Sequence, residues 1–170
     1  ARQGGASAAL ATRLLAALVA TPGERPTDAA ISASALATLR GILQDGRVAP
    51  SMRCDAAWAL SNIAAGTTAQ AQRLLDATGT FKALCGALEQ GRDAAVKHEC
   101  AWAVVNLARR GSQALPQLDG RKLLATLASA LKGESGVPLL CTLLDASDAA
   151  LRLCEEQAAA KGLSPGATVA

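Results

Sequence analysis

Hydrophobic residues recur along the chain with helical spacing, and short segments rich in glycine, proline, serine or threonine separate them. In the first segment, Leu10, Leu14 and Leu18 recur every fourth residue, which places them on one face of a helix. The proline- and glycine-containing stretch 21–26 then interrupts the pattern. The same reasoning predicts helices at about 7–20, 27–44, 51–65, 69–76, 81–88, 93–109, 115–118, 123–131 and 137–161, with loose ends at 1–5 and 162–170.

Two of the long predicted helices, at 51–65 and 93–109, carry nearly the same sequence. Trp58 and Trp102 are the only tryptophans of the chain, and they lie 44 residues apart. The same offset relates further pairs of similar residues: Asn62 and Asn106, Asp55 and Glu99, and Arg53 and Lys97. A period of roughly 40–47 residues is typical of armadillo and HEAT repeats, in which each unit consists of two or three helices.

The repeat and the composition together predict an all-α fold. Hydrophobic residues make up 51% of the chain but aromatic residues only 2%, so the apolar content is mostly alanine and leucine, which are strong helix formers. The order short helix, middle helix, long helix favours a short right-handed armadillo-type superhelical solenoid of about three to four helical repeats. The expected units are an N-terminal helix with a Pro/Gly loop at 1–26, armadillo-like repeats at 27–66 and 67–111, a degenerate repeat at 112–161 and a flexible tail at 162–170.

The polar residues around each tryptophan predict a peptide-binding stripe. Asp55, Trp58 and Asn62 are spaced three and four residues apart, so they share one helix face. An indole can hold the aliphatic stem of a basic side chain and attract its charge by roughly 0.5–2 kcal/mol. A carboxamide can bind a peptide backbone, and a carboxylate can pair with a basic head group. The second stripe consists of Glu99, Trp102 and Asn106.

A purely structural interpretation of the same residues stays open. Tryptophan often belongs to the core of an all-α protein, and its N–H then needs a partner. Asn62 and Asn106 stand one turn after Trp58 and Trp102 and could supply that partner. Charged residues such as Asp55 are also ordinary on a solvated helix face.

The two tryptophan helices resemble those of importin-α, the armadillo-repeat adaptor that carries basic nuclear-localisation signals. The resemblance rests on segments 55–66 and 100–107, extends through 68–76, and includes 137–145 and 151–157, which are similar to segments near the last repeats of that family. It therefore points to the C-terminal third of importin-α, where the minor signal-binding site lies.

This resemblance implies a role for each residue of the two stripes. Basic side chains of the guest would stack on Trp58 and Trp102. Asn62 and Asn106 would hold the guest backbone, and Asp55 and Glu99 would lie close to the basic heads. The implied partner is a protein or an extended Lys/Arg-rich peptide, and the implied location is the cytoplasm and nucleus.

Catalytic, cofactor and membrane functions find no support in the sequence. His98 and Cys100 stand two residues apart on a predicted helix, so they point to different sides and cannot form a nucleophile–base pair. No metal-ligand spacing and no phosphate-binding loop occurs, so we expect no enzyme activity, no metal and no cofactor. A net charge of +3 with few aromatic residues argues against nucleic acid. No apolar run reaches the roughly 20 residues of a membrane span. The five cysteines lack C-x-x-C spacing and are expected to be small apolar residues in a reducing compartment.

An alternative function is that of an accessory structural subunit of a large multiprotein assembly, in which the peptide groove is unused. The flanking long helices at 7–20 and 137–161 lack the tryptophan–asparagine signature. The chain also starts with alanine, and Arg2 and Arg13 precede its first acidic residue, Glu24. Such a start resembles the remainder of an organelle presequence, so a mitochondrial or other organellar location is the alternative to the cytoplasm and nucleus.

Overall fold

The computed structural model describes residues 2–132, 134 and 136–162, and within these residues the regular structure is entirely helical. The first helices are α1 (Arg2–Val19), α2 (Glu24–Ser32), α3 (Ala35–Gln44), α4 (Pro50–Ala65) and α5 (Thr68–Asp76). The later ones are α6 (Thr80–Gln90), α7 (Ala94–Ala108), α8 (Gly111–Ala114), α9 (Gly120–Leu131) and α10 (Val137–Ala160). The predicted flexible tail lies, except for Gly162, outside the described residues.

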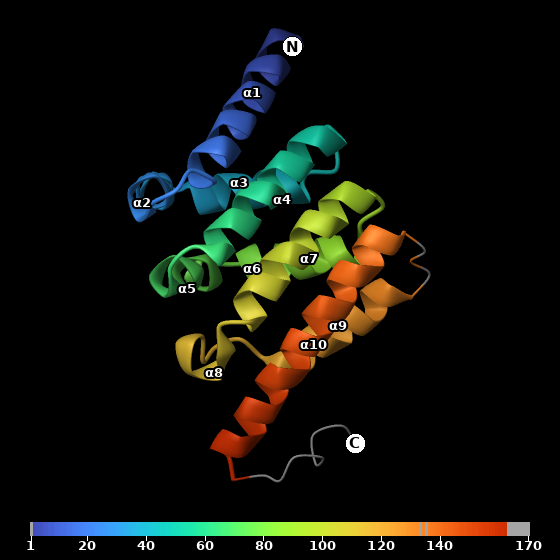
Figure 1. The fold of residues 1–170 in the computed structure, drawn as a ribbon. Helices are drawn as coiled ribbons and strands as arrows, with labels where there is room; N and C mark the ends of the chain where they lie inside the picture. Colours follow the sequence, from blue (N-terminus) through green and yellow to red (C-terminus); the bar gives the residue numbers. More distant parts are fainter. Residues whose placement is uncertain (1, 133, 135, 163–170) are drawn as a thin grey trace.

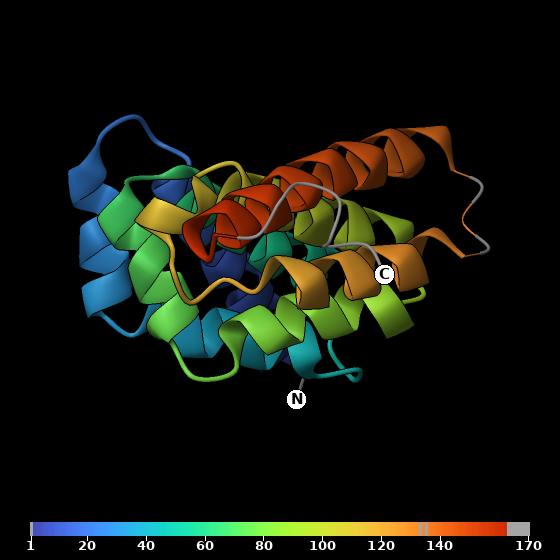
Figure 2. The ribbon, with the colours of Figure 1, turned by 90° about the horizontal axis from the view of Figure 1, so that it is seen from below.

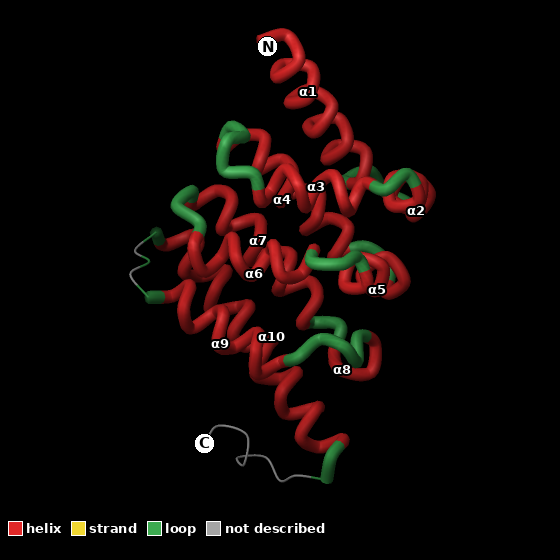
Figure 3. The backbone as a smooth tube through the Cα atoms, turned by 180° about the vertical axis from the view of Figure 1, so that it is seen from behind, coloured by secondary structure: helices red, strands yellow, loops and turns green. Residues whose placement is uncertain are grey.

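The helices form a two-layer stack (Figure 1). One row consists of the long helices α1, α4, α7 and α10, each packed against the next. The middle helices α3, α6 and α9 form a second row behind them, which is nearer the viewer in Figure 3. The short helices α2, α5 and α8 lie along one edge, and Figure 2 shows them at one end of both layers. The expected helical solenoid is therefore confirmed.

The hydrophobic core lies between the two rows. The middle helices contribute fully buried leucines, among them Leu39, Leu84 and Leu123. The long helices contribute alanines without any exposed surface, such as Ala57 on α4 and Ala103 on α7. Small side chains at these positions let neighbouring long helices pack closely, which is why an alanine-rich sequence suits this stack.

Capping residues set where several helices begin. The Thr67 side chain accepts a hydrogen bond from the Gln70 backbone N–H, and the Gln70 side chain accepts one from the Thr67 backbone N–H, so the two residues form a capping box at α5. Asp93 and Asp119 cap α7 and α9 through their side-chain oxygens. Pro50 stands in the first turn of α4, where no intrahelical N–H bond is needed.

The prediction of one helix over 27–44 is wrong. The structure divides this stretch into α2 and α3 at Ser34, which adopts a left-handed conformation with φ of 65°. Neither glycine nor proline marks this break in the sequence. The break lets α2 pack against α1 and α5 while α3 packs against α4 and α6, so each half buries its own apolar face.

Two further local predictions also need correction. Residues 2–5 were expected to be loose, but they belong to α1. A short helix was expected at 115–118, but α8 ends before this stretch and the loop after it buries Leu115 and Leu118. This loop leads into a close approach of α9 and α10. A Cβ atom on Gly120 would lie 2.7 Å from the Cys154 sulfur, so only glycine fits there.

Candidate functional site

The six predicted site residues lie on two adjacent helices, and helical spacing puts the three residues of each helix on one face. Asp55, Trp58 and Asn62 lie on α4, and their counterparts Glu99, Trp102 and Asn106 lie on α7, which packs directly against α4. All six side chains are half-buried, while the residues that flank them along each helix are mostly buried. Both tryptophans rest with part of their surface on the core and leave the rest open. We call the surface formed by these six residues the ladder face.

The indole N–H groups do not bond to the asparagines. The Asn62 amide nitrogen donates to the Trp58 backbone carbonyl at 3.0 Å. The Asn106 amide nitrogen donates across the helix interface to the Ser61 carbonyl of α4 at 3.2 Å. Neither indole N–H has a hydrogen-bond partner among the described residues. Neither indole nitrogen belongs to the buried polar atoms that lack a partner, so both N–H groups are accessible to solvent. The structural interpretation, in which asparagine satisfies a buried indole, is therefore not what the geometry shows.

Each asparagine is held by its nitrogen and leaves its oxygen open. The described residues donate no hydrogen bond to the side-chain oxygen of Asn62 or Asn106. A carboxamide oxygen can accept two hydrogen bonds. Asn62 also lines a cavity of about 340 Å³ between the ends of α1 and α4 and the start of α2. The open oxygens can therefore accept a backbone N–H from a guest.

The two acids of the ladder face differ in their partners. Arg13 of α1 donates to the Asp55 carboxylate at 2.9 Å, and the Asp55 side chain is only 13% exposed. Glu99 instead meets the Ser61 hydroxyl of α4 at 3.3 Å, and it forms no ion pair with any described residue. Burial raises the pKa of Glu99 above its ordinary value, and the Ser61 hydroxyl and the charge of His98 oppose this shift only in part.

Side chains of α7 next to the second tryptophan contact α10 and the segment that precedes it. The His98 ring lies edge-on to Trp102, with ring centroids 6.4 Å apart and planes at 65°. The His98 Nε2 atom lies 3.0 Å from the Thr142 hydroxyl of α10. Lys97 pairs with Glu134 at 3.1 Å, and both side chains are only 14% exposed. The Thr142 contact ties α7 to α10, and the Glu134 contact ties α7 to the segment between α9 and α10.

Sequence reasoning missed Arg13, Ser61 and His98 as neighbours of the ladder face. Each of them contacts a ladder residue by a different route: an ion pair from α1, a hydroxyl from α4, and a ring edge from the preceding turn of α7. Only His98 carried a signal, because it stands four residues before Trp102 on the same helix. The other two contacts depend on how the helices pack against one another.

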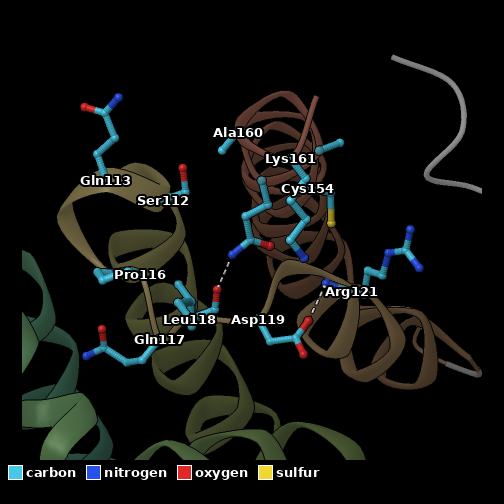
Figure 4. A pocket seen from close by; sticks show the side chains of 12 residues that line it. Ser112, Gln113, Pro116, Gln117, Leu118, Asp119, Arg121, Cys154, Ala160 and Lys161 are labelled. Carbon is cyan, nitrogen blue, oxygen red and sulfur yellow. Dashed lines mark hydrogen bonds between the residues drawn. The ribbon is translucent and has the colours of Figure 1, made fainter. Parts of the chain in front are cut away.

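Another cavity lies between α8, the start of α9 and the end of α10 (Figure 4). Its volume is about 710 Å³. Its polar groups already serve the fold: the Gln157 amide donates to the Leu118 carbonyl at 2.6 Å, and Asp119 caps α9. Burial raises the pKa of the Cys154 thiol at its edge, so this thiol stays protonated and is a poor nucleophile.

The remaining chemistry of the described residues points to structural roles. Burial raises the pKa of Cys85 to about 11 and also raises that of Cys100, which is fully buried. In the part of the chain that the structure describes, no group of three His, Cys, Asp or Glu side chains could hold a metal ion. None of the described helices is both long and apolar enough to cross a bilayer.

Solved structures of armadillo-repeat proteins share this fold. A designed armadillo-repeat protein in complex with the peptide (KR)4 superposes with a TM-score of 0.70 and 25% identity, covering 87% of this chain and 63% of that one. An engineered protein matches with a TM-score of 0.70 and 24% identity, over 82% of this chain and 54% of that one. A computationally designed armadillo-repeat protein for modular peptide recognition matches with a TM-score of 0.67 and 21% identity, over 88% and 73%. The chain thus spans between about half and three quarters of these structures.

These matches confirm the armadillo-type repeat fold, whereas the resemblance to importin-α stays a prediction. No curated protein sequence matches the chain. The family model of the interferon-related developmental regulators matches residues 2–159, which is nearly all of the sequence. The chain therefore belongs to the interferon-related developmental regulator (IFRD) family.

Proposed function

We propose that this protein is a non-catalytic interaction scaffold whose ladder face binds an extended peptide that carries lysine or arginine side chains. One observation carries the proposal. Trp58 and Trp102 stand at equivalent positions of neighbouring long helices, half-buried and with their N–H groups open. If the two tryptophans served only the hydrophobic core, both rings would be buried and both N–H groups would have hydrogen-bond partners within the protein.

The ladder face offers each kind of contact that such a guest needs. The open indole surfaces hold the methylene stems of basic side chains and attract their charged heads. The open oxygens of Asn62 and Asn106 accept hydrogen bonds from backbone N–H groups of the guest. Glu99 supplies a carboxylate that forms no ion pair with a described lysine or arginine. The partner is therefore a protein or peptide with spaced basic side chains.

The comparison with solved structures supports this choice of guest. One of the similar armadillo-repeat proteins was solved in complex with a peptide of alternating lysine and arginine. A guest of this chemistry would have the composition of a nuclear-localisation signal, and the scaffold would then act in the cytoplasm and nucleus. Both the importin-α-like use of the ladder face and this location are parts of the proposal.

A peptide titration followed by tryptophan fluorescence tests the proposal. The chain has two tryptophans and no tyrosine, so its intrinsic emission comes from the ladder face. A blocked eight-residue peptide of alternating lysine and arginine should change the emission saturably. The matched control is the same peptide with glutamate at every basic position, which should produce no change. Absence of a saturable change with the basic peptide would refute the proposed function.

A second candidate function is supported by the two ends of the stack. Leucines on the outer face of α1 are exposed, with Leu10 at 62% and Leu14 at 61%. On α10 the exposed hydrophobic residues include Val137 at 68% and Leu144 at 59%. Contiguous apolar faces of this kind mark protein contacts. They favour an accessory structural subunit of a larger assembly, in which the end faces are covered and the ladder face is unused.

Light scattering after size-exclusion chromatography tests this second candidate. Uncovered leucine faces should make the isolated protein self-associate as its concentration rises. The double variant Leu14→Gln and Leu144→Gln should remain monomeric at the same concentrations, without a change in thermal unfolding. A wild-type protein that stays monomeric at high concentration would count against the structural-subunit function.

A further inference from the structure

The two acids of the ladder face occupy equivalent positions in consecutive repeats. Asp55 lies on α4 beside α1, and Glu99 lies on α7 beside α4. Each carboxylate therefore sits where one long helix meets the preceding one. If the repeat were perfect, both sites would offer the same binding position to a basic side chain.

The first of these sites is already filled from within the chain. The Arg13 side chain starts on α1, is 67% exposed, and donates its guanidinium to the Asp55 carboxylate at 2.9 Å. This contact joins residues 42 positions apart, so it belongs to the packing of α1 on α4 rather than to one helix. Arg13 thus provides the charge-assisted hydrogen bond that a guest arginine or lysine would otherwise make with Asp55.

At the second site no lysine or arginine of the described residues pairs with Glu99, and His98, on the same helix, is the one described basic side chain whose charge acts on it. The only described side chain that donates to Glu99 is the Ser61 hydroxyl at 3.3 Å. That hydroxyl also lies 2.9 Å from the Trp58 carbonyl, and its single hydrogen cannot serve both acceptors fully. A half-buried carboxylate with one shared donor is incompletely hydrogen-bonded. A basic side chain of a guest would therefore gain more binding free energy beside Glu99 than beside Asp55.

We infer that Arg13 occupies the guest cation position beside Asp55, so that the ladder face anchors one basic side chain of its guest, beside Glu99 and between the two tryptophan helices. This inference rests on the proposed function and adds the selectivity of the site to it. Removal of Arg13 opens the position beside Asp55 for a second basic side chain. Among the spaced basic side chains of a guest, only one therefore pairs with a carboxylate of the ladder face in the natural protein.

Two blocked peptides test the inference. The first carries one lysine among alanine and serine residues, and the second carries two lysines at positions i and i+2. In an extended peptide these two side chains point to the same side and lie about 7 Å apart. Affinity is measured for the wild type, Arg13→Ala and Glu99→Gln in 0.15 M salt, where long-range charge effects are screened. Thermal unfolding of each variant shows that the stack is retained.

The wild-type protein should bind the two peptides with nearly equal affinity. Arg13→Ala should bind the one-lysine peptide as the wild type does but the two-lysine peptide about fivefold more tightly, since a partly exposed ion pair contributes up to about 1 kcal/mol. Glu99→Gln should weaken the binding of both peptides. The matched control is Arg121→Ala, which removes the same charge from α9, away from the ladder face, and should show no such gain.

The outcomes separate this inference from the proposed function. If the wild type binds neither peptide, the proposed function fails and the inference fails with it. Suppose that the one-lysine peptide binds and that Glu99→Gln weakens this binding, but that Arg13→Ala does not bind the two-lysine peptide more tightly than the wild type does. The proposed function then stands and the inference is wrong. An equal gain in Arg121→Ala would also overturn it, because the effect would then be one of net charge.

Discussion

Replacing Leu60 by alanine is expected to lower the free energy of unfolding by about 2–5 kcal/mol, the usual cost of removing a large side chain from a packed core. Leu60 lies on α4 and has no exposed surface. This helix packs against α1 and α7 within the long row and against α3 of the middle row. A cavity at Leu60 therefore weakens contacts in both directions of the stack. Urea denaturation followed by circular dichroism measures the change.

Leu144→Ala is the matched control for this prediction. The same three carbon atoms are removed, but Leu144 lies on the outer face of α10 with 59% of its surface exposed. Its free energy of unfolding should change by less than about 0.5 kcal/mol, as is usual for surface positions. Equal destabilisation by the two substitutions would contradict the location of the core between the two helix rows.

Trp102→Ala is expected to weaken the binding of a lysine- and arginine-containing peptide by about 10- to 100-fold. The variant loses a cation–π contact of roughly 0.5–2 kcal/mol and the apolar surface that covers a basic side chain's stem, at about 0.8 kcal/mol per buried methylene. Together these correspond to about 1.5–3 kcal/mol of binding free energy, which sets the expected factor. Isothermal titration calorimetry measures it without relying on the fluorophore that is removed.

The control for Trp102→Ala has to separate binding from folding, because Trp102 also packs on the core. Phe81→Ala serves this purpose. Phe81 is half-buried against the same core but lies on α6, in the row of middle helices. Phe81→Ala should lower the free energy of unfolding about as much as Trp102→Ala does, and it should leave peptide affinity unchanged. If Phe81→Ala weakened binding as much as Trp102→Ala, the loss would reflect general destabilisation.

Periodic features of this fold could be predicted from the sequence. The 44-residue offset between Trp58 and Trp102 predicted two equivalent long helices, and α4 and α7 begin and end within one residue of the expected 51–65 and 93–109. The grouping of Asp55, Trp58 and Asn62 on one helix face also followed, because helical spacing alone fixes which residues of a helix share a face. The caps Thr67 and Asp93 are local features of the same kind, because they act on backbone groups two or three residues away.

Features that depend on contacts between distant residues could not be predicted. The left-handed Ser34 divides α2 from α3 without a glycine or proline signal, because the packing of the two halves on different neighbours selects the break. The pairing of Arg13 with Asp55 and of Ser61 with Glu99 depends on the register between long helices. These two contacts make the two stripes chemically different, although their sequences are nearly the same.

The most direct test of the ladder face is a nitrogen–proton correlation spectrum recorded during peptide titration. The chain has two tryptophans, so its indole N–H groups give two signals, which Trp58→Phe and Trp102→Phe assign. Because both N–H groups are open and lie on adjacent helices, we expect a lysine- and arginine-containing peptide to shift both signals with the same dissociation constant. A peptide that binds while both indole signals stay in place would contradict this expectation.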